Sequence, residues 1–231
     1  MQIFRLISDI ITDVIEKNED DGGVFMEEST MPTLFKRITF YLIGICAIGF
    51  GVAAIINAQK GAGAFDAFIV GVASKTGLTI GVSMNIVAVT FLLVAAGIEK
   101  KIPRFLSLIT SVLVGIIIDF CMLVIFKDIS INNHFWQWVL LISSTVVLSA
   151  GISFAISSTM PLSPADVPVI IMNQKFGIKL VTSKLIFDGI MLILAILLGG
   201  PVGIGTIIVT LGTGPLIQIL TPYTKQWMDN N

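Results

Sequence analysis

Charged residues are scarce in this sequence. They make up 13% of the 231 residues, whereas hydrophobic residues make up 55%. The mean hydropathy is +0.96. Because soluble domains carry roughly 25% charged residues, the composition excludes an ordinary soluble domain and a disordered chain. Lys and Arg number 14 against 15 Asp and Glu, so the chain is not a strongly basic nucleic-acid-binding protein, and we expect no nucleic acid as a partner.

Cysteine and histidine are scarce as well. Cys46 and Cys121 both lie in apolar segments, and His134 is the single histidine. The chain has no Cys/His cluster and neither an HExxH nor a GxSxG motif. We therefore expect no catalytic residues, no metal site, no cofactor and no enzymatic activity.

Long apolar segments dominate what is present. Each has about the twenty residues that a helix needs to cross a hydrocarbon core of about 30 Å. They cover residues 38–58, 79–98, 105–126, 136–158, 180–198 and 204–220, and two shorter segments, 62–75 and 162–175, lie among them. The pattern predicts an all-α polytopic membrane protein in contact with the lipid bilayer.

The order of these segments occurs twice. An offset of 100 residues aligns the two short segments without a gap, and in both halves a long segment precedes a short one and two long ones follow. The aligned pairs include Gly51 with Gly151, Asp66 with Asp166, Lys75 with Lys175, and Thr110 with Thr210. We therefore predict two internal repeats, in residues 36–131 and 132–222, followed by a short tail, 223–231. Such duplication is common in secondary transporters.

The two short segments allow two topologies. From Asp66 to Lys75 a helix would rise only about 13.5 Å, roughly half a membrane. We therefore expect each repeat to contain three transmembrane helices and one short re-entrant helix, with eight spans as the alternative. Asp66 and Asp166, near the starts of the short helices, either compensate the helix dipole as capping residues or face a solute or ion site where half-helices meet.

Basic residues indicate the orientation. Lys36 and Arg37 precede the first long segment, so the N-terminus is predicted to be cytoplasmic, and the C-terminus is cytoplasmic in both topologies. With re-entrant helices the cluster Lys100, Lys101 and Arg104 is also cytoplasmic, whereas with eight spans it lies outside.

Three charged residues lie inside the long segments. Lys184 and Asp188 are four residues apart on one helix and are expected to pair, and Asp119 lies near the end of its segment. Charged groups at membrane depth are costly and suggest functional sites. The alternative is that Asp119 and Asp188 belong to a structural ion-pair or hydrogen-bond network.

Small and polar residues recur every fourth position in both halves. Thr145, Ser149, Ser153 and Ser157 align with Ile45, Gly49, Ala53 and Asn57. This stripe either allows close helix packing or lines a central pathway. The candidate solute or ion site predicted from the sequence therefore comprises Asp66, Asp166, Asp119, Asp188, Lys184 and Asn57.

Residues 1–35 differ from the rest because they hold eight of the fifteen acidic residues. Apolar residues from Ile3 to Val14 recur at helical spacing, which predicts an amphipathic helix followed by a polar linker. This helix is expected to lie on the membrane surface or to pack on the transmembrane helices or a protein partner.

Several motifs resemble the YczE/YyaS/YitT family of bacterial membrane proteins. They are GxGxFD ending at Asp66, KTGLTIGxS at 75–83, GIIID at 115–119, PAD at 164–166, KFGIK at 175–179 and GGPVGIGT at 199–206. The resemblance covers about residues 36–222. It implies a multi-pass plasma-membrane protein of bacterial type whose activity is not established.

Two functions remain open from the sequence. The duplication, the short helices and the buried acids favour a secondary-transporter-like permease for a small solute or ion. The alternative is a non-transporting membrane protein that regulates or assembles a partner complex, for instance through its N-terminal helix. Because the sequence has no nucleotide-binding loop, transport would be ion-coupled, passive or driven by a partner ATPase.

Overall fold

The protein is described here by a computed structural model that covers residues 31–99, 106–129, 131–160, 167–178 and 180–230. Within these ranges it is helical and contains no strand. Residues from Lys36 onward form one compact unit, distinct from residues 1–35. The helices are α2 (Met31–Asn57), α3 (Ala64–Thr76), α4 (Ile80–Glu99), α5 (Leu106–Phe120) with the π-helical turn η1 (Cys121–Ile125), α6 (His134–Ser157), α7 (Val167–Phe176), α8 (Leu180–Leu198) and α9 (Ile204–Asn230).

Large apolar side chains cover the outside of this unit. Leu93 on α4 is 62% exposed and Leu197 on α8 is 72% exposed, which suits contact with lipid rather than water. Five of the described helices, namely α2, α4, α5 with η1, α6 and α9, contain segments long and apolar enough to cross a membrane. The prediction of an all-α polytopic membrane protein is therefore confirmed.

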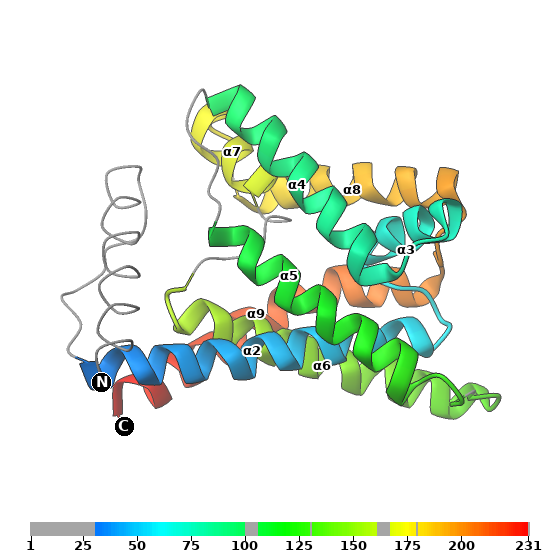
Figure 1. Cartoon of the computed structure of the whole chain (residues 1–231), viewed down its shortest axis with the longest axis horizontal. Coiled ribbons are helices and arrows are strands. Elements are labelled where there is room, and N and C mark those ends of the chain that lie inside the picture. The colour runs from blue at the N-terminus through cyan, green and yellow to red at the C-terminus, as the bar shows by residue number, and fades with distance from the viewer. Residues whose placement is uncertain (1–30, 100–105, 130, 161–166, 179, 231) are drawn as a thin grey trace. The chain divides into compact units, whose positions relative to one another are not determined.

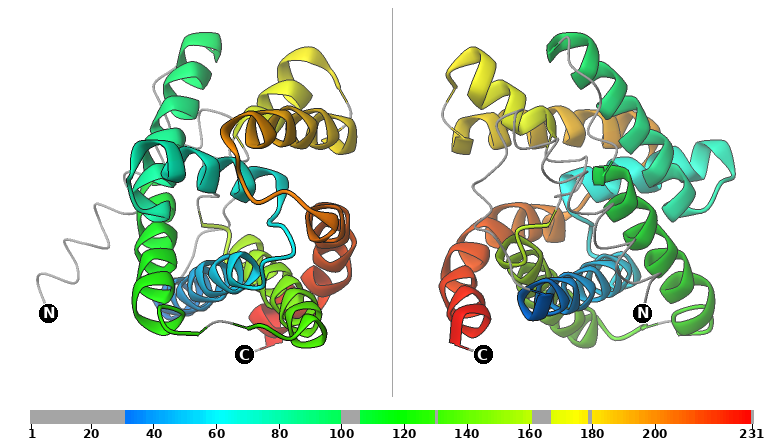
Figure 2. Two further views of the ribbon diagram at one scale, coloured as in Figure 1. Left: turned by 90° about the vertical axis from the view of Figure 1, so that its right-hand side faces the viewer. Right: turned by 60° about the vertical axis from the view of Figure 1, so that its left-hand side comes forward.

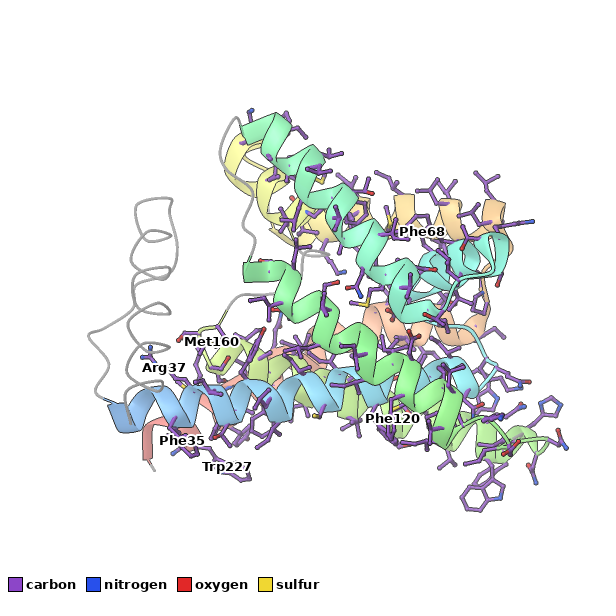
Figure 3. All side chains as sticks on the ribbon, viewed as in Figure 1. Phe35, Arg37, Phe68, Phe120, Met160 and Trp227 are labelled. Atoms are coloured by element: carbon purple, nitrogen blue, oxygen red, sulfur yellow. The ribbon has the colours of Figure 1, made fainter. Side chains whose placement is uncertain are left out.

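The long helices run back and forth along one direction. In Figure 1, α2, α5 and α8 run from left to right, and α4, α6 and α9 run from right to left. Arg37 near the start of α2, Met160 after the end of α6 and Trp227 near the end of α9 consequently lie at the same end (Figure 3). The amino group of Lys36 also donates to the carbonyl oxygen of Met228, which links the start of α2 to the end of α9.

Helices α2 and α6 pack side by side in opposite directions (Figure 2). A Cβ atom on Gly51 would lie 3.0 Å from the Cα atom of Leu148, and one on Gly151 would lie 2.8 Å from the backbone nitrogen of Ile48. Residue 51 therefore contacts 148, and residue 151 contacts 48. The small residues of these helices allow their backbones to approach closely.

Helices α4 and α5 cross even more closely. A Cβ atom on Gly81 would lie 2.2 Å from the carbonyl oxygen of Gly115, so only glycine fits at this crossing. The Ser111 hydroxyl of α5 donates to the Asn85 side-chain oxygen of α4 over 2.8 Å. Together these contacts join the two helices into one hairpin.

The short helix α3 packs mainly on α8 and runs in the same direction. Phe65 near its start contacts Phe187, with ring centroids 6.3 Å apart, and Gly71 lies against Leu198 at the end of α8. The turn that follows α8 holds the segment before α3, since the Ala62 N–H donates to the Pro201 carbonyl oxygen over 3.0 Å. This arrangement fixes where α3 begins.

The polar stripe on α6 serves packing. Thr145, Ser149, Ser153 and Ser157 are all buried, and the first three donate to carbonyl oxygens one turn earlier on their own helix. The Ser157 hydroxyl lies 2.7 Å from that of Thr224 on α9. Of the two interpretations of this stripe, the contacts therefore support helix packing.

Candidate functional site

A cavity of about 290 Å³ lies within the compact unit. Helices α2, α3, α4, α5, α6, α8 and α9 all contribute to its wall, which is mostly apolar. The charged residues of the described lining are Asp66, Lys184 and Asp188, and its hydroxyl groups belong to Thr110, Thr210 and Thr213. The cavity therefore brings together three of the six predicted site residues.

The start of α3 faces this cavity. Gly63 precedes the helix and offers no side chain to cap it, and the Ala64 N–H instead donates to the Thr210 hydroxyl oxygen of α9 over 3.2 Å. A Cβ atom on Gly63 would lie 3.1 Å from a carboxylate oxygen of Asp66. A residue larger than glycine at position 63 would therefore crowd the Asp66 carboxylate in the first turn of α3.

Asp66 lies in the first turn of α3, where a negative charge compensates the helix dipole. The N-cap position itself is Gly63, which makes no side-chain capping hydrogen bond. Among the described residues, the Asp66 carboxylate makes no hydrogen bond and no ion pair. Lys184 and Asp188 act on it only through longer-range electrostatic effects. The Asp66 carboxylate oxygens can therefore accept hydrogen bonds from a solute in the cavity.

Lys184 and Asp188 form the ion pair that their spacing predicts. The Lys184 ammonium nitrogen lies 2.8 Å from a carboxylate oxygen of Asp188. The Asp188 side chain is 9% exposed and that of Lys184 is 49% exposed, so the carboxylate is buried while the ammonium reaches open space. Asp188 is ten residues from the end of α8, which corresponds to about 15 Å along the helix.

Three phenylalanine rings from different helices form one wall of this region. Phe65 of α3 and Phe187 of α8 line the cavity, and Phe91 of α4 packs against both, with centroid distances of 6.2 and 5.8 Å. The Lys184 ammonium lies 5.5 Å from the centre of the Phe187 ring. We call Phe65, Phe91 and Phe187 the aromatic wall.

Asp119 lies near the end of α5, outside the described cavity lining, and its carboxylate contacts the start of α4. One of its carboxylate oxygens accepts a 2.6 Å hydrogen bond from the Thr79 hydroxyl, and the other accepts a 2.8 Å bond from the Gly81 N–H. It therefore satisfies a free N–H group of the first turn of α4 from a neighbouring helix, as a capping residue does. This geometry favours the structural role for Asp119.

Asp119→Ala is expected to destabilise the fold without affecting the cavity. Loss of a capping acceptor costs about 1–2 kcal/mol, or a fall in melting temperature of roughly 2–8 °C for a chain of this size. Thermal unfolding in detergent measures this, with the exposed Asp128→Ala as the matched control. A normal melting temperature combined with lost solute binding would contradict the structural role.

The remaining predicted residues lie outside the described cavity lining. Asn57 is the last residue of α2, and its side-chain nitrogen is buried without a hydrogen-bond partner in the described structure. Asp166 lies outside the described residues. No group of three or more His, Cys, Asp or Glu residues suited to a metal ion occurs in the described part of the chain.

Sequence reasoning missed the aromatic wall and the threonines of the cavity. Phenylalanine is common in apolar segments, so nothing local distinguishes these three from lipid-facing rings. Thr110 and Thr210 did carry a signal, because they align at the offset of 100 residues and both line the cavity.

Comparison with known proteins places the chain among uncharacterized membrane proteins. The matching family model, described as a family of unknown function (DUF6198), covers residues 35–222. The uncharacterized protein YyaS of Bacillus subtilis (strain 168) is 28% identical over 190 residues, which are 82% of this chain and 94% of YyaS. The uncharacterized membrane protein YczE of the same strain is 24% identical over 197 residues, which are 85% of this chain and 90% of YczE. These matches confirm the resemblance drawn from the motifs, and no solved structure matches the chain.

Proposed function

We propose, from the premise that this chain belongs to the DUF6198 family of unknown function, that it is a secondary-transporter-like permease for a small solute and not an enzyme. The observation that carries this proposal is the cavity of about 290 Å³ walled by seven helices. Small-molecule sites are typically concave and mostly apolar, with a few polar groups that fix orientation. The cavity has this composition, with Asp66, Lys184 and Asp188 as its charged groups.

Several contacts support two inverted repeats. Residue 51 contacts residue 148, and the residues equivalent to them at the offset of 100, 151 and 48, also contact each other. Such matching contacts are expected for two halves related by a two-fold axis. Helix α3 packs on α8 and helix α7 packs on α4, which are again equivalent pairs. Because α2 and α6 run in opposite directions (Figure 1), the axis would lie in the membrane plane, as in many transporters.

The length and placement of α3 support a re-entrant helix. It has 13 residues, and it ends toward the same side of the unit as the end of α2 (Figure 1). The Phe65–Phe187 contact places its start eleven residues before the end of α8, or about 16 Å along that helix. This is about half of a 30 Å hydrocarbon core. We therefore propose six spans, formed by α2, α4, α5, α6, α8 and α9.

Charged and aromatic residues support an orientation. Lys36, Arg37, Lys175 and Lys225 occur where α2 begins and where α7 and α9 end, and the sequence between α4 and α5 adds Lys100, Lys101 and Arg104. By the positive-inside rule these residues support a cytoplasmic location for the start of α2 and the end of α9. Exposed aromatic residues occur at both ends of the long helices, as in interfacial belts; they are Phe135 and Trp136 at one end and Tyr223 and Trp227 at the other.

Cysteine labelling distinguishes six spans from eight. In a variant with Cys46 and Cys121 replaced by serine, an impermeant maleimide applied to intact cells should label Lys127→Cys. It should label Lys101→Cys only after the membrane is permeabilised. Eight spans would give the reverse pattern for this matched pair.

Reconstituted transport tests the function itself. Proteoliposomes containing the purified protein should accumulate at least one compound from a metabolite extract under a proton or sodium gradient, relative to protein-free liposomes. The compound is identified by untargeted mass spectrometry. If folded protein accumulates nothing under any gradient, the non-transporting alternative is favoured, in which the N-terminal helix outside the described residues would bind a partner.

A further inference from the structure

We propose that the solute of this cavity is a compact organic cation, with its charged nitrogen at Asp66 and its apolar part against the aromatic wall. This inference rests on the proposed permease function and names its substrate class. Three independent features of the cavity support it: the charge of its lining, the ring faces beside Asp66, and the small number of oxygen ligands.

The charge balance favours a cation. Two carboxylates, Asp66 and Asp188, face the cavity against one ammonium group, Lys184. The ammonium is bonded to Asp188 at 2.8 Å, which leaves the Asp66 carboxylate without a direct partner among the described side chains. The start of α3 contributes only about half a positive charge. An isolated carboxylate is costly in an apolar cavity, and a bound cation would relieve that cost.

The aromatic wall suits the same ligand. Cations are attracted to the faces of aromatic rings within about 6 Å of the ring centre. The Lys184 ammonium already occupies such a position, 5.5 Å from the centre of the Phe187 ring, so a ligand cation would avoid this ammonium and use the Phe65 ring, which also lines the cavity. Phe65 directly precedes Asp66, and its ring belongs to the same cluster as that of Phe187. A phenylalanine ring and the Asp66 carboxylate therefore border the same cavity.

The lining disfavours a bare metal ion. Ca²⁺ and Mg²⁺ require about six or more oxygen ligands at short distance. The described lining offers two carboxylates, one of them paired with lysine, together with three threonine hydroxyls among apolar side chains. An organic cation needs fewer oxygen contacts because its apolar groups can pack against Met84, Val114 and the Phe65 and Phe187 rings that line the cavity.

Equilibrium binding to the purified full-length protein in nanodiscs tests the proposal. The probes are two isosteric or near-isosteric pairs, choline with 3,3-dimethylbutan-1-ol and benzylamine with benzyl alcohol, together with phenylacetate as an anion. We expect at least one cation to bind at least about tenfold more tightly than its neutral partner, as a desolvated ion pair with cation–π contact allows. Isothermal titration calorimetry measures each affinity.

Matched variants assign the effect to Asp66. Asp66→Asn should remove the preference for the cation, and Asp66→Glu should restore part of it. Asp119→Asn alters a carboxylate outside the cavity and should leave the preference intact. A preference that survives Asp66→Asn in folded protein, tighter binding of phenylacetate or of the neutral probes, or no binding of either cation would overturn the proposal.

The result is separable from the test of transport. Cation binding without uptake in proteoliposomes would remove the permease function and keep the cation site. Uptake of a neutral or anionic solute would keep the permease and remove the cation site.

Discussion

Gly81→Ala is expected to lower the stability of the protein by about 3 kcal/mol, the upper end of the usual cost of overpacking. The added Cβ atom would lie 2.2 Å from the carbonyl oxygen of Gly115 and 2.7 Å from a carboxylate oxygen of Asp119. A backbone carbonyl cannot rotate away as a side chain can, so α4 and α5 would have to separate. That movement would also break the Asp119 hydrogen bonds to Thr79 and Gly81.

Gly97→Ala on the same helix is the matched control. A Cβ atom there meets nothing within 4 Å, and alanine favours a helix over glycine by up to about 1 kcal/mol. In detergent, Gly81→Ala should lower the melting temperature by roughly 6–12 °C, whereas Gly97→Ala should leave it unchanged or raise it slightly. Equal effects at both positions would show that helix propensity, not the crossing, determines the cost.

Asp188→Asn is expected to abolish ion-coupled uptake while the protein still folds. The amide keeps the shape of the side chain and can still accept a hydrogen bond from Lys184, so we expect a stability loss of only about 1 kcal/mol. It cannot carry a proton or a negative charge. If the permease couples transport to an ion at this carboxylate, uptake per folded molecule should fall to background.

The double variant Lys184→Gln/Asp188→Asn separates coupling from simple pairing. If Asp188 serves only to neutralise Lys184, Asp188→Asn should lower the melting temperature strongly, and the double variant should restore both stability and uptake. If Asp188 couples transport, the double variant should be stable and inactive. Melting temperature and uptake are measured on the same preparation.

The sequence predicted those features that depend on local spacing. Helix length follows from the length of an apolar segment, so the long helices and the short α3 and α7 could be located in advance. The Lys184–Asp188 pair follows from i,i+4 geometry on one helix. The alignment at 100 residues paired Thr110 with Thr210, although neither was predicted to belong to the site.

Features that depend on tertiary approach could not be predicted. For Asp119 the sequence left open a choice between a functional site and a structural network, because the N–H group that it satisfies belongs to Gly81, 38 residues earlier. For Asp66 the sequence left open a choice between compensating the helix dipole and facing a solute or ion site, because only the fold shows that Asp66 lines a cavity. The aromatic wall combines rings from three helices, which no single helical pattern could bring together.

The close crossing of α4 and α5 has no counterpart between α8 and α9, the helices that correspond to them one hundred residues later. This difference affects how stiff each side of the cavity is. Val181 and Pro215 stand at the positions that correspond to Gly81 and Gly115, and among the described contacts α8 packs on α3 and α7 rather than on α9. Gly212 and Gly214 face open space, and Pro215 leaves a carbonyl of α9 without its helical partner. We therefore expect the α4–α5 hairpin to be the stiffer side of the cavity. The more compliant side would be the part of α9 around Pro215, which precedes the hydrogen bonds of α9 to Ser153 and Ser157 of α6. Thermal or ligand-driven bending should concentrate in the few residues around Pro215, of which Thr213 and Gly214 border the same cavity.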